Sequence, residues 1–277
     1  MIKYVENINI SVNMALSMKV SVIITSYNDP RIRSTLLSLN EQSYPPDEIF
    51  VADGGSKIDI ESICLKFSVK FEMIPGNIPQ TRSAVINKAT GDILVFIDTD
   101  EIAPKQWLEN LVNPIIKGEA DFTGGPTKHL PTSSQTVLYV NLLEDEMYKG
   151  LVQKDIRYLP MGNSAWSRKI FTKIGTFNSN LPGSEDYDIN IRAMNAGFIG
   201  KFIPEAWVYH DHSDIDTIFK LIRKRYKYLR TTAKVYRMQS MFKSRLSIRN
   251  KRVVRHPFYV IEEFLKPLAL IDSMIRD

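Results

Sequence analysis

The feature that most constrains this chain is an apolar run that ends in two carboxylates, Asp98-Thr99-Asp100. Residues 93–97 are all apolar, which is typical of a parallel strand buried on both faces of a sheet. In an extended chain Asp98 and Asp100 point to the same side, and two hard oxygen ligands at a strand end suit a divalent cation bound to a diphosphate. An ordinary strand-to-helix turn, in which Asp is also common, explains the triplet equally well.

Strand and helix patterns alternate through the first hundred residues. We predict strands at residues 20–25, 48–52, 70–74 and 92–97, and helices at 31–42, 59–67 and 79–89. This order predicts an α/β fold with a parallel sheet, whose ligand site lies at the carboxyl ends of the strands. Three polar loops, 25–28, 53–56 and 98–100, meet at that edge. None carries a glycine-rich dinucleotide motif or a P-loop, so a bound diphosphate would depend on a metal ion.

Length and composition set the outer bounds. A chain of 277 residues that is 44% hydrophobic builds a full core, so we expect one large domain, alone or with an appendage. Cys64 is the single cysteine, which excludes an intrachain disulfide and makes a reduced, cytoplasmic location the default expectation. No apolar run reaches the roughly 18 to 20 residues that span a bilayer. Residues 1–17 lack the apolar core of a signal peptide, and we treat residues 1–18 as an extension of unknown role.

Eleven ordered motifs give the chain a resemblance to a known family. They are residues 20–28, 51–56, Thr81-Arg82, 91–100, 162–165, Arg168, 175–177, 185–188, Arg192, Gly197 and 204–210. In order and approximate spacing they resemble glycosyltransferase family 2. The resemblance covers about residues 19–212 and implies a GT-A fold, a Rossmann-like, mainly parallel mixed sheet flanked by helices. It also implies a catalytic domain at 19–213, with a nucleotide-binding half at 19–100 and an acceptor-binding half at 101–213.

Carried over position by position, the resemblance implies a donor site. The nucleoside pocket would be lined by Thr25, Tyr27, Asp53 and Arg82, with Tyr27 beside the base. Many family members have two consecutive acids after the second strand, whereas here Gly54 follows Asp53. Recognition of the base, uridine or guanosine, is therefore left open.

The resemblance also implies a metal ion and a base. Asp98 would face the ribose or the metal, and Asp100 would bind Mn²⁺ or Mg²⁺ directly. His210 would complete the metal site, although a lone histidine at a strand end is as often structural, and His212 is the weaker choice. Asp186 would take the proton from the acceptor hydroxyl, with the neighbouring acids at 185 and 188 as supports. Acids in a first helical turn also stabilise the helix dipole, which is the alternative interpretation.

Beyond residue 213 the composition changes. Residues 214–277 contain 16 Lys and Arg against 6 Asp and Glu, whereas the rest of the chain contains 20 against 25. Apolar and basic residues recur at spacings of three and four from 215 to 237, which predicts a basic amphipathic helical tail. Its basic face would either be solvated or contact an anionic membrane. Residues 258–271 fit an interfacial or packed helix.

The resemblance implies a metal-dependent, inverting glycosyltransferase, and the basic tail suggests a place for it at the inner face of the cell membrane. It would move a sugar from a UDP- or GDP-sugar to a hydroxyl of a glycan or lipid-linked acceptor. Trp166 could offer a flat face to a sugar ring or lipid. The alternatives are a sugar nucleotidyltransferase, whose usual glycine-rich first loop is absent, and a catalytically silent nucleotide-binding module at a membrane. We predict no nucleic-acid partner, because the tail contains no recognised reading motif.

Overall fold

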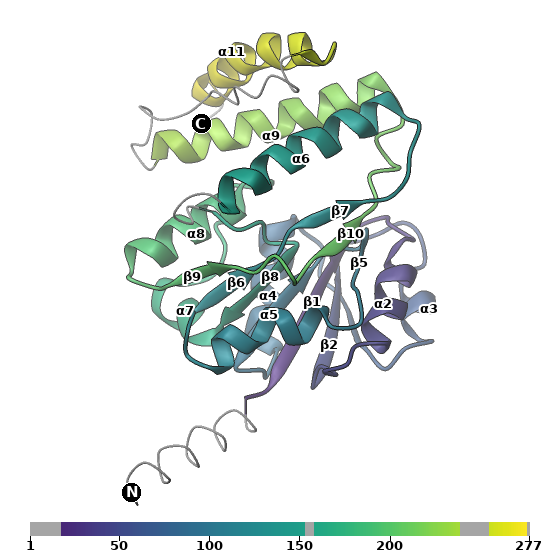
Figure 1. Cartoon of the computed structure of the whole chain (residues 1–277), viewed down its shortest axis with the longest axis vertical. Coiled ribbons are helices and arrows are strands. Elements are labelled where there is room, and N and C mark those ends of the chain that lie inside the picture. The colour runs from purple at the N-terminus through teal and green to yellow at the C-terminus, as the bar shows by residue number, and fades with distance from the viewer. Residues whose placement is uncertain (1–17, 153–157, 239–254, 276–277) are drawn as a thin grey trace, which may run out of the picture.

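A mixed sheet forms the centre of the computed structural model, which describes residues 18–152, 158–238 and 255–275. Its seven strands follow the order β3-β2-β1-β4-β8-β6-β9 (Figure 1). Every neighbouring pair is parallel except the pairs of β8, which runs antiparallel to β4 and β6. The strands are β1 (Val20–Ser26), β2 (Glu48–Asp53), β3 (Lys70–Met73), β4 (Ile93–Ile97), β6 (Phe122–Gly124), β8 (Asn163–Ser167) and β9 (Gly200–Phe202). The predicted mainly parallel α/β fold is confirmed.

Helices cover both faces of this sheet, because its central strands are apolar on both sides. Val22 and Ile24 of β1 belong to one core cluster, whereas Ile23 between them belongs to the other. The first cluster is covered by α2 (Ile32–Asn40), α3 (Glu61–Cys64) and α5 (Trp107–Ile116), and the second by α4 (Ile78–Lys88), α7 (Arg168–Ile174) and α8 (Glu185–Asn195). The three predicted helices of the first half are all present, although the second is reduced to a single turn.

A smaller sheet lies beside the carboxyl ends of the central strands. It joins β5 (Glu101–Ile102), β10 (Val208–His210) and β7 (Thr127–His129) in that order. β5 starts directly after Asp100, and the register sets His210 opposite both Glu101 and His129. Segments far apart in the sequence therefore meet next to the Asp98-Thr99-Asp100 loop.

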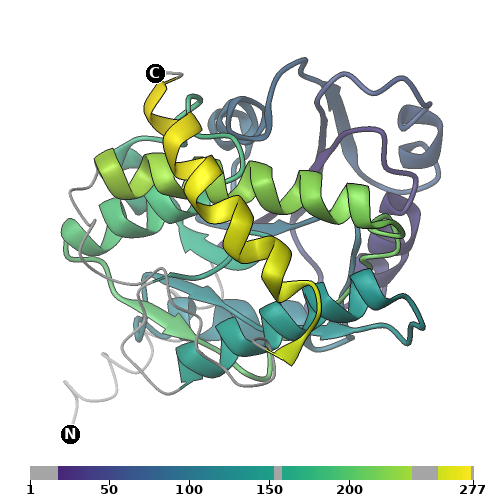
Figure 2. The same ribbon diagram turned by 90° about the horizontal axis from the view of Figure 1, so that it is seen from above.

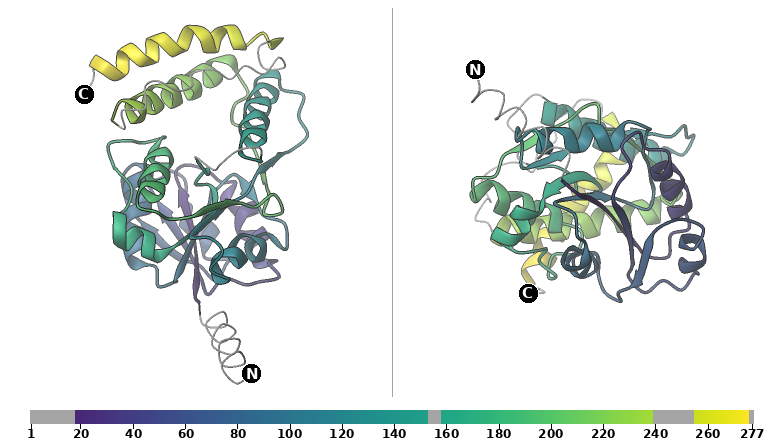
Figure 3. Two further views of the ribbon diagram at one scale, coloured as in Figure 1. Left: turned by 60° about the vertical axis from the view of Figure 1, so that its left-hand side comes forward. Right: turned by 90° about the horizontal axis from the view of Figure 1, so that it is seen from below.

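Three long helices, α6 (Gln135–Val152), α9 (Ile218–Met238) and α11 (Tyr259–Ile275), lie beyond that edge of the sheet (Figures 1 and 3). α11 crosses the outer side of α9 (Figure 2), and Arg225 of α9 forms an ion pair with the buried Glu262 of α11. Both predicted tail helices are present. Within the described ranges no helix has the length and apolar character needed to cross a membrane. Residues 1–17 of the predicted extension, and 239–254 of the tail, lie outside the described residues.

Candidate active site

Two of the three polar loops are joined at the ends of β1 and β2. The backbone N–H of Gly54 donates to the carbonyl oxygen of Ser26 at 2.8 Å, and the N–H of Asn28 donates to Ser56 Oγ at 2.6 Å. Asn28 has a φ of 54°, a left-handed conformation that Asn tolerates better than most residues. These two loops therefore meet at the sheet edge, as predicted.

Three of the four predicted nucleoside residues lie at or directly after the ends of β1 and β2, namely Thr25, Tyr27 and Asp53. Asp53 is buried, and its carboxylate accepts from the N–H groups of Gly55 and Ser56 at 2.9 and 2.6 Å, so it shapes its own turn. Thr25 is half-buried, whereas Tyr27 is 62% exposed and available to a ligand. Their contacts with a nucleoside remain predictions.

The departure from the family pattern at position 54 has a steric reason. A Cβ at Gly54 would lie 3.2 Å from the carbonyl oxygen of Gly76 and 3.7 Å from Tyr27 Cδ2. A second acid would therefore crowd the loop that leads into α4. That loop is held by a capping box between Asn77 and Gln80.

Arg82 connects the two halves of the site. Its Nη2 lies 2.8 Å from Asp98 Oδ1 and its Nη1 lies 2.9 Å from Glu185 Oε1, on the first turn of α8. The arginine and the glutamate are both buried. Burial alone would lower the pKa of Arg82, but the two carboxylates outweigh it and the pKa is raised. The link from Arg82 to Glu185 was not predicted, because nothing in the sequence pairs positions 103 residues apart.

Asp100 and His210 face each other, as predicted for a metal site. Asp100 Oδ2 lies 3.4 Å from His210 Nε2 and 3.5 Å from Arg31 Nη2. Two ligands on one ion, with bonds of about 2.1 Å, lie roughly 3.0 to 3.4 Å apart, so this pair fits a divalent cation. Burial would raise the pKa of Asp100, but the charges of His210 and Arg31 lower it below its ordinary value, so the carboxylate is ionised.

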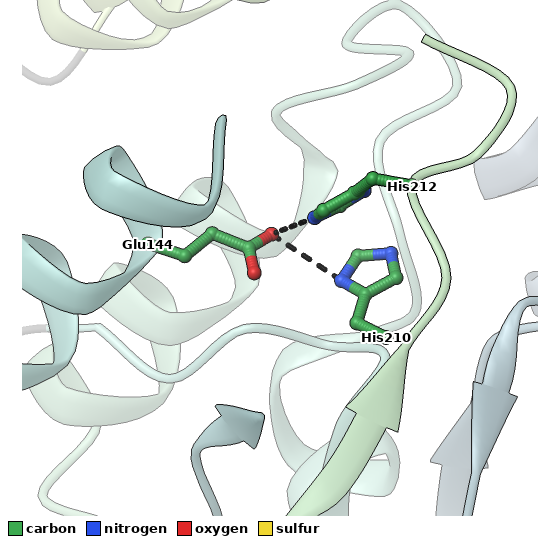
Figure 4. A group of neighbouring side chains, drawn as sticks. All are labelled: Glu144, His210 and His212. Atoms are coloured by element: carbon green, nitrogen blue, oxygen red, sulfur yellow. Dashed lines mark hydrogen bonds and ion pairs between the residues drawn. The ribbon is translucent and has the colours of Figure 1, made fainter. Parts of the chain in front are cut away.

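The opposite side of His210 faces Glu144 of α6 (Figure 4). Glu144 Oε1 lies 3.3 Å from His210 Nδ1 and 2.9 Å from His212 Nε2. Among the described residues these three side chains form the group whose spacing could hold a metal ion. Burial lowers the pKa of His210, but Glu144 and Asp100 outweigh it and the pKa is raised. Glu144 was not predicted, because residues 126–157 match no motif.

Asp186 lies in the first turn of α8 and is held by two hydrogen bonds. Its Oδ1 accepts from the N–H of Tyr187 at 2.8 Å, and its Oδ2 accepts from the hydroxyl of Tyr158 at 2.5 Å. The rings of Tyr158 and Tyr187 stack with centroids 4.1 Å apart. Burial, and next the charge of Glu185, raise the pKa of Asp186 to about 7, against the hydrogen bond from Tyr158.

The neighbouring acids of α8 have cationic partners. Glu185 pairs with Arg82, and Asp188 Oδ2 lies 2.8 Å from Arg192 Nε. No such ion pair to Asp186 is found within the described part of the chain. Of the three acids Asp186 is therefore the one suited to exchange a proton near neutral pH.

α9 lies over this end of α8. The hydroxyl of Ser184 donates to Thr231 Oγ1 at 2.9 Å, and the positive charge of Lys224 contributes to the lowered pKa of Asp100. The tail predicted as an appendage thus contacts the loop that precedes Asp186.

The prediction that Trp166 offers a flat face to a sugar ring or lipid is wrong. Trp166 is fully buried and stacks on Phe122 with centroids 4.4 Å apart, so it presents no face to a ligand.

Comparison with known proteins identifies the family of the chain. The family described as Glycosyl transferase family 2 matches residues 21–177. The uncharacterized glycosyltransferase YfnE of Bacillus subtilis is 27% identical over 65% of this chain and 61% of its own length. Glycosyltransferase AglE of Haloferax volcanii is 26% identical over 65% of this chain and 62% of its own length. The chain thus spans about three fifths of the length of these relatives.

Solved structures show the same fold. The mannosyltransferase PcManGT from Pyrobaculum calidifontis, in complex with GDP-Man and Mn²⁺, superposes with a TM-score of 0.61 at 16% identity, over 93% of this chain and 73% of that one. Glucosyl-3-phosphoglycerate synthase from Mycobacterium tuberculosis, with Mn²⁺, UDP-glucose and phosphoglyceric acid, gives a TM-score of 0.54 at 19% identity, over 79% and 81%. The chain has the GT-A fold, and with its family match over more than half its length it belongs to glycosyltransferase family 2.

Proposed function

We propose that the chain transfers a sugar from a UDP- or GDP-sugar to an acceptor hydroxyl with inversion, using Mn²⁺ or Mg²⁺. The observation that carries this proposal is that a cation-type ligand pair, Asp100 and His210, and a carboxylate with a pKa of about 7, Asp186, occur at one end of the same sheet. Arg82 forms ion pairs with Asp98, in the loop that contains Asp100, and with Glu185, on the helix that contains Asp186. In this proposal residues 19–100 bind the nucleotide and residues 101–213 bind the acceptor.

The donor would lie along the carboxyl ends of β1, β2 and β4. Tyr27 would stack on the base, with Thr25, Asp53 and Arg82 lining the nucleoside pocket and Asp98 facing the ribose. A bound cation would stabilise the charge of the departing diphosphate. Both GDP- and UDP-containing complexes occur among the similar structures, which supports a nucleotide sugar without selecting its base.

Asp186 would act as the general base. As the acceptor oxygen attacks the anomeric carbon, its proton passes to Asp186 and the bond from that carbon to the diphosphate oxygen breaks. One displacement inverts the configuration. Tyr158 and the N–H of Tyr187 hold the carboxylate in place through its two oxygens.

A screen of nucleotide sugars for slow hydrolysis tests this proposal without knowledge of the acceptor. We expect one or a few UDP- or GDP-sugars to be hydrolysed when Mn²⁺ or Mg²⁺ is present, with activity lost in EDTA. Asp186→Asn should retain binding of the nucleoside diphosphate. If no UDP- or GDP-sugar binds or is hydrolysed with either metal, the proposal is wrong.

We further propose that the acceptor is lipid-linked and that the tail contacts an anionic membrane at its cytoplasmic face. A curated relative, 24% identical over 59% of this chain, is named glucosyl-dolichyl phosphate glucuronosyltransferase, which supports a lipid-linked acceptor. The apolar face of α9 is partly covered, with Leu221 and Val235 buried. The surface left for a membrane is instead the outer face of α11, where apolar side chains are between 53% and 74% exposed: Val260, Phe264, Leu268, Ile271 and Ile275.

Liposome sedimentation tests this contact. We expect binding to anionic vesicles that falls in high salt, because salt screens the basic residues of the tail. The double substitution Phe264→Asp and Leu268→Asp should reduce binding. Leu65→Asp, at a similarly exposed apolar position at the end of α3, is the matched control and should have no effect. Equal recovery of the parent and the α11 variant would refute the role of this face.

A further inference from the structure

Three of the four histidines in the chain surround one carboxylate, that of Glu144. His129 Nδ1 lies 3.9 Å from its Oε2, and His210 and His212 lie within 3.3 Å of its Oε1. The histidines come from neighbouring strands β7 and β10 and the loop after β10, whereas Glu144 comes from α6. Three of only four histidines at one carboxylate are more than chance placement would give.

Glu144 is itself firmly held. Thr127 Oγ1 donates to its Oε2 at 2.8 Å, and His212 Nε2, which is buried, lies 2.9 Å from its Oε1. His210 Nδ1 is also buried and lies 3.3 Å from the same Oε1 without hydrogen-bond geometry, so a small rotation of the ring would complete that bond. The other ring nitrogen, Nε2, faces Asp100 at 3.4 Å.

We propose that Glu144 is a positioning residue for the cation: it accepts a hydrogen bond from the Nδ1–H of His210 and so presents Nε2, with its lone pair, to an ion that His210 would share with Asp100. Histidine ligands of metals generally donate their other N–H to a carboxylate or carbonyl, which fixes the tautomer and the orientation of the ring. This inference rests on the proposed function. It goes beyond that function because it assigns Glu144 of α6 an effect on the affinity for the metal ion.

The competing arrangement is an ion between Glu144, His210 and His212. It is disfavoured because an ion ligated by both Glu144 and His212 Nε2 would break the 2.9 Å hydrogen bond between them. A hydrogen bond from the Nδ1–H of His210 breaks nothing, because each carboxylate oxygen can accept two. An ion held by Asp100 and His210 would instead lie at the polar loop 98–100, which follows the carboxyl end of β4.

The test is titration of Mn²⁺ into the full chain in the presence of excess UDP and, separately, GDP, with free Mn²⁺ followed by electron paramagnetic resonance. We expect Glu144→Gln to weaken Mn²⁺ binding by about 10- to 100-fold. Binding of the nucleotide without metal should be unchanged. Asp145→Asn is the matched control, since Asp145 is the next residue of α6 and pairs with His129 at 3.0 Å; it should leave Mn²⁺ affinity unchanged. A purely structural role would lower the unfolding temperature of Glu144→Gln while leaving the Mn²⁺ affinity of the folded protein intact.

Two further variants locate the ion. Asp100→Ala and His210→Ala should both abolish Mn²⁺ binding, whereas His212→Asn should weaken it less than Glu144→Gln does. If His212→Asn abolishes binding and Asp100→Ala retains it, the ion lies on the Glu144 side and the inference is overturned. If the parent chain shows no metal-dependent nucleotide binding, the proposed function fails, whereas unchanged Mn²⁺ affinity in Glu144→Gln overturns the positioning role alone.

Discussion

Removal of one hydroxyl, in Tyr158→Phe, should shift the pH dependence of catalysis. The Tyr158 hydroxyl donates to Asp186 Oδ2 at 2.5 Å and stabilises the ionised carboxylate, so its loss raises the pKa of Asp186 above its value of about 7. A hydrogen bond to a charged group contributes about 1.5 to 3 kcal/mol, and one pKa unit corresponds to about 1.4 kcal/mol. Because water recovers part of that loss, we expect an upward shift of about one unit. The phenyl ring still stacks on Tyr187, so the fold should be retained.

The assay is kcat/KM for the donor against pH, which reports the pKa of the free enzyme. A base is active when ionised, so the parent rate should fall as pH drops below about 7. In Tyr158→Phe that fall should begin near pH 8, with a roughly tenfold lower rate at pH 6 and a similar plateau at pH 9. Tyr139→Phe is the control, because the Tyr139 hydroxyl is buried without a hydrogen-bond partner among the described residues. An unshifted or downward-shifted profile for Tyr158→Phe would refute the assignment of Asp186 as the base.

Three further substitutions test other parts of the site. Asp186→Asn should lower transfer by about two to four powers of ten at every pH and leave nucleotide affinity unchanged; a loss of only a few-fold would point to another base. Asp100→Ala should remove the Mn²⁺ dependence of nucleoside diphosphate binding in calorimetry, and persistence of that dependence would exclude Asp100 as a ligand. Arg82→Ala leaves the buried Glu185 unpaired, so urea unfolding should show a loss of about 3 to 5 kcal/mol, against little change for the exposed Arg33→Ala.

The sequence was informative where the chemistry is local. The strands could be predicted because short apolar runs bounded by polar turns are typical of buried strands. Asp98 and Asp100 directly follow such a run. The order of strands and helices was enough to bring residues 25–28, 53–56 and 98–100 to one edge. The family resemblance added the start of α8, whose acids by themselves are equally typical of a stabilised helix end.

The contacts that depend on tertiary placement could not be predicted. Arg82 reaches Glu185 because α4 and α8 both pack on the same face of the sheet. Glu144 lies in a helix whose sequence carries no motif, and only the position of α6 beside β10 brings it to His210. The prediction for Trp166 was wrong because the side chain of a strand residue next to a candidate site can equally well point into the core.

The boundary at residue 213 between catalytic domain and tail can be tested by ending the chain near Ser213. α9 buries Val235 against Leu181 and Ile191, and each fully buried aliphatic side chain stabilises a fold by about 1.5 to 3 kcal/mol. Loss of α9 also removes the hydrogen bond from Ser184 to Thr231, and Ser184 lies two residues before Asp186. The shortened chain should therefore unfold at lower urea concentration and lose donor hydrolysis, whereas the double substitution on the outer face of α11 should impair liposome binding alone. An unchanged urea midpoint with full hydrolysis would show that α9 serves only as an attachment, and the boundary at 213 would then be correct.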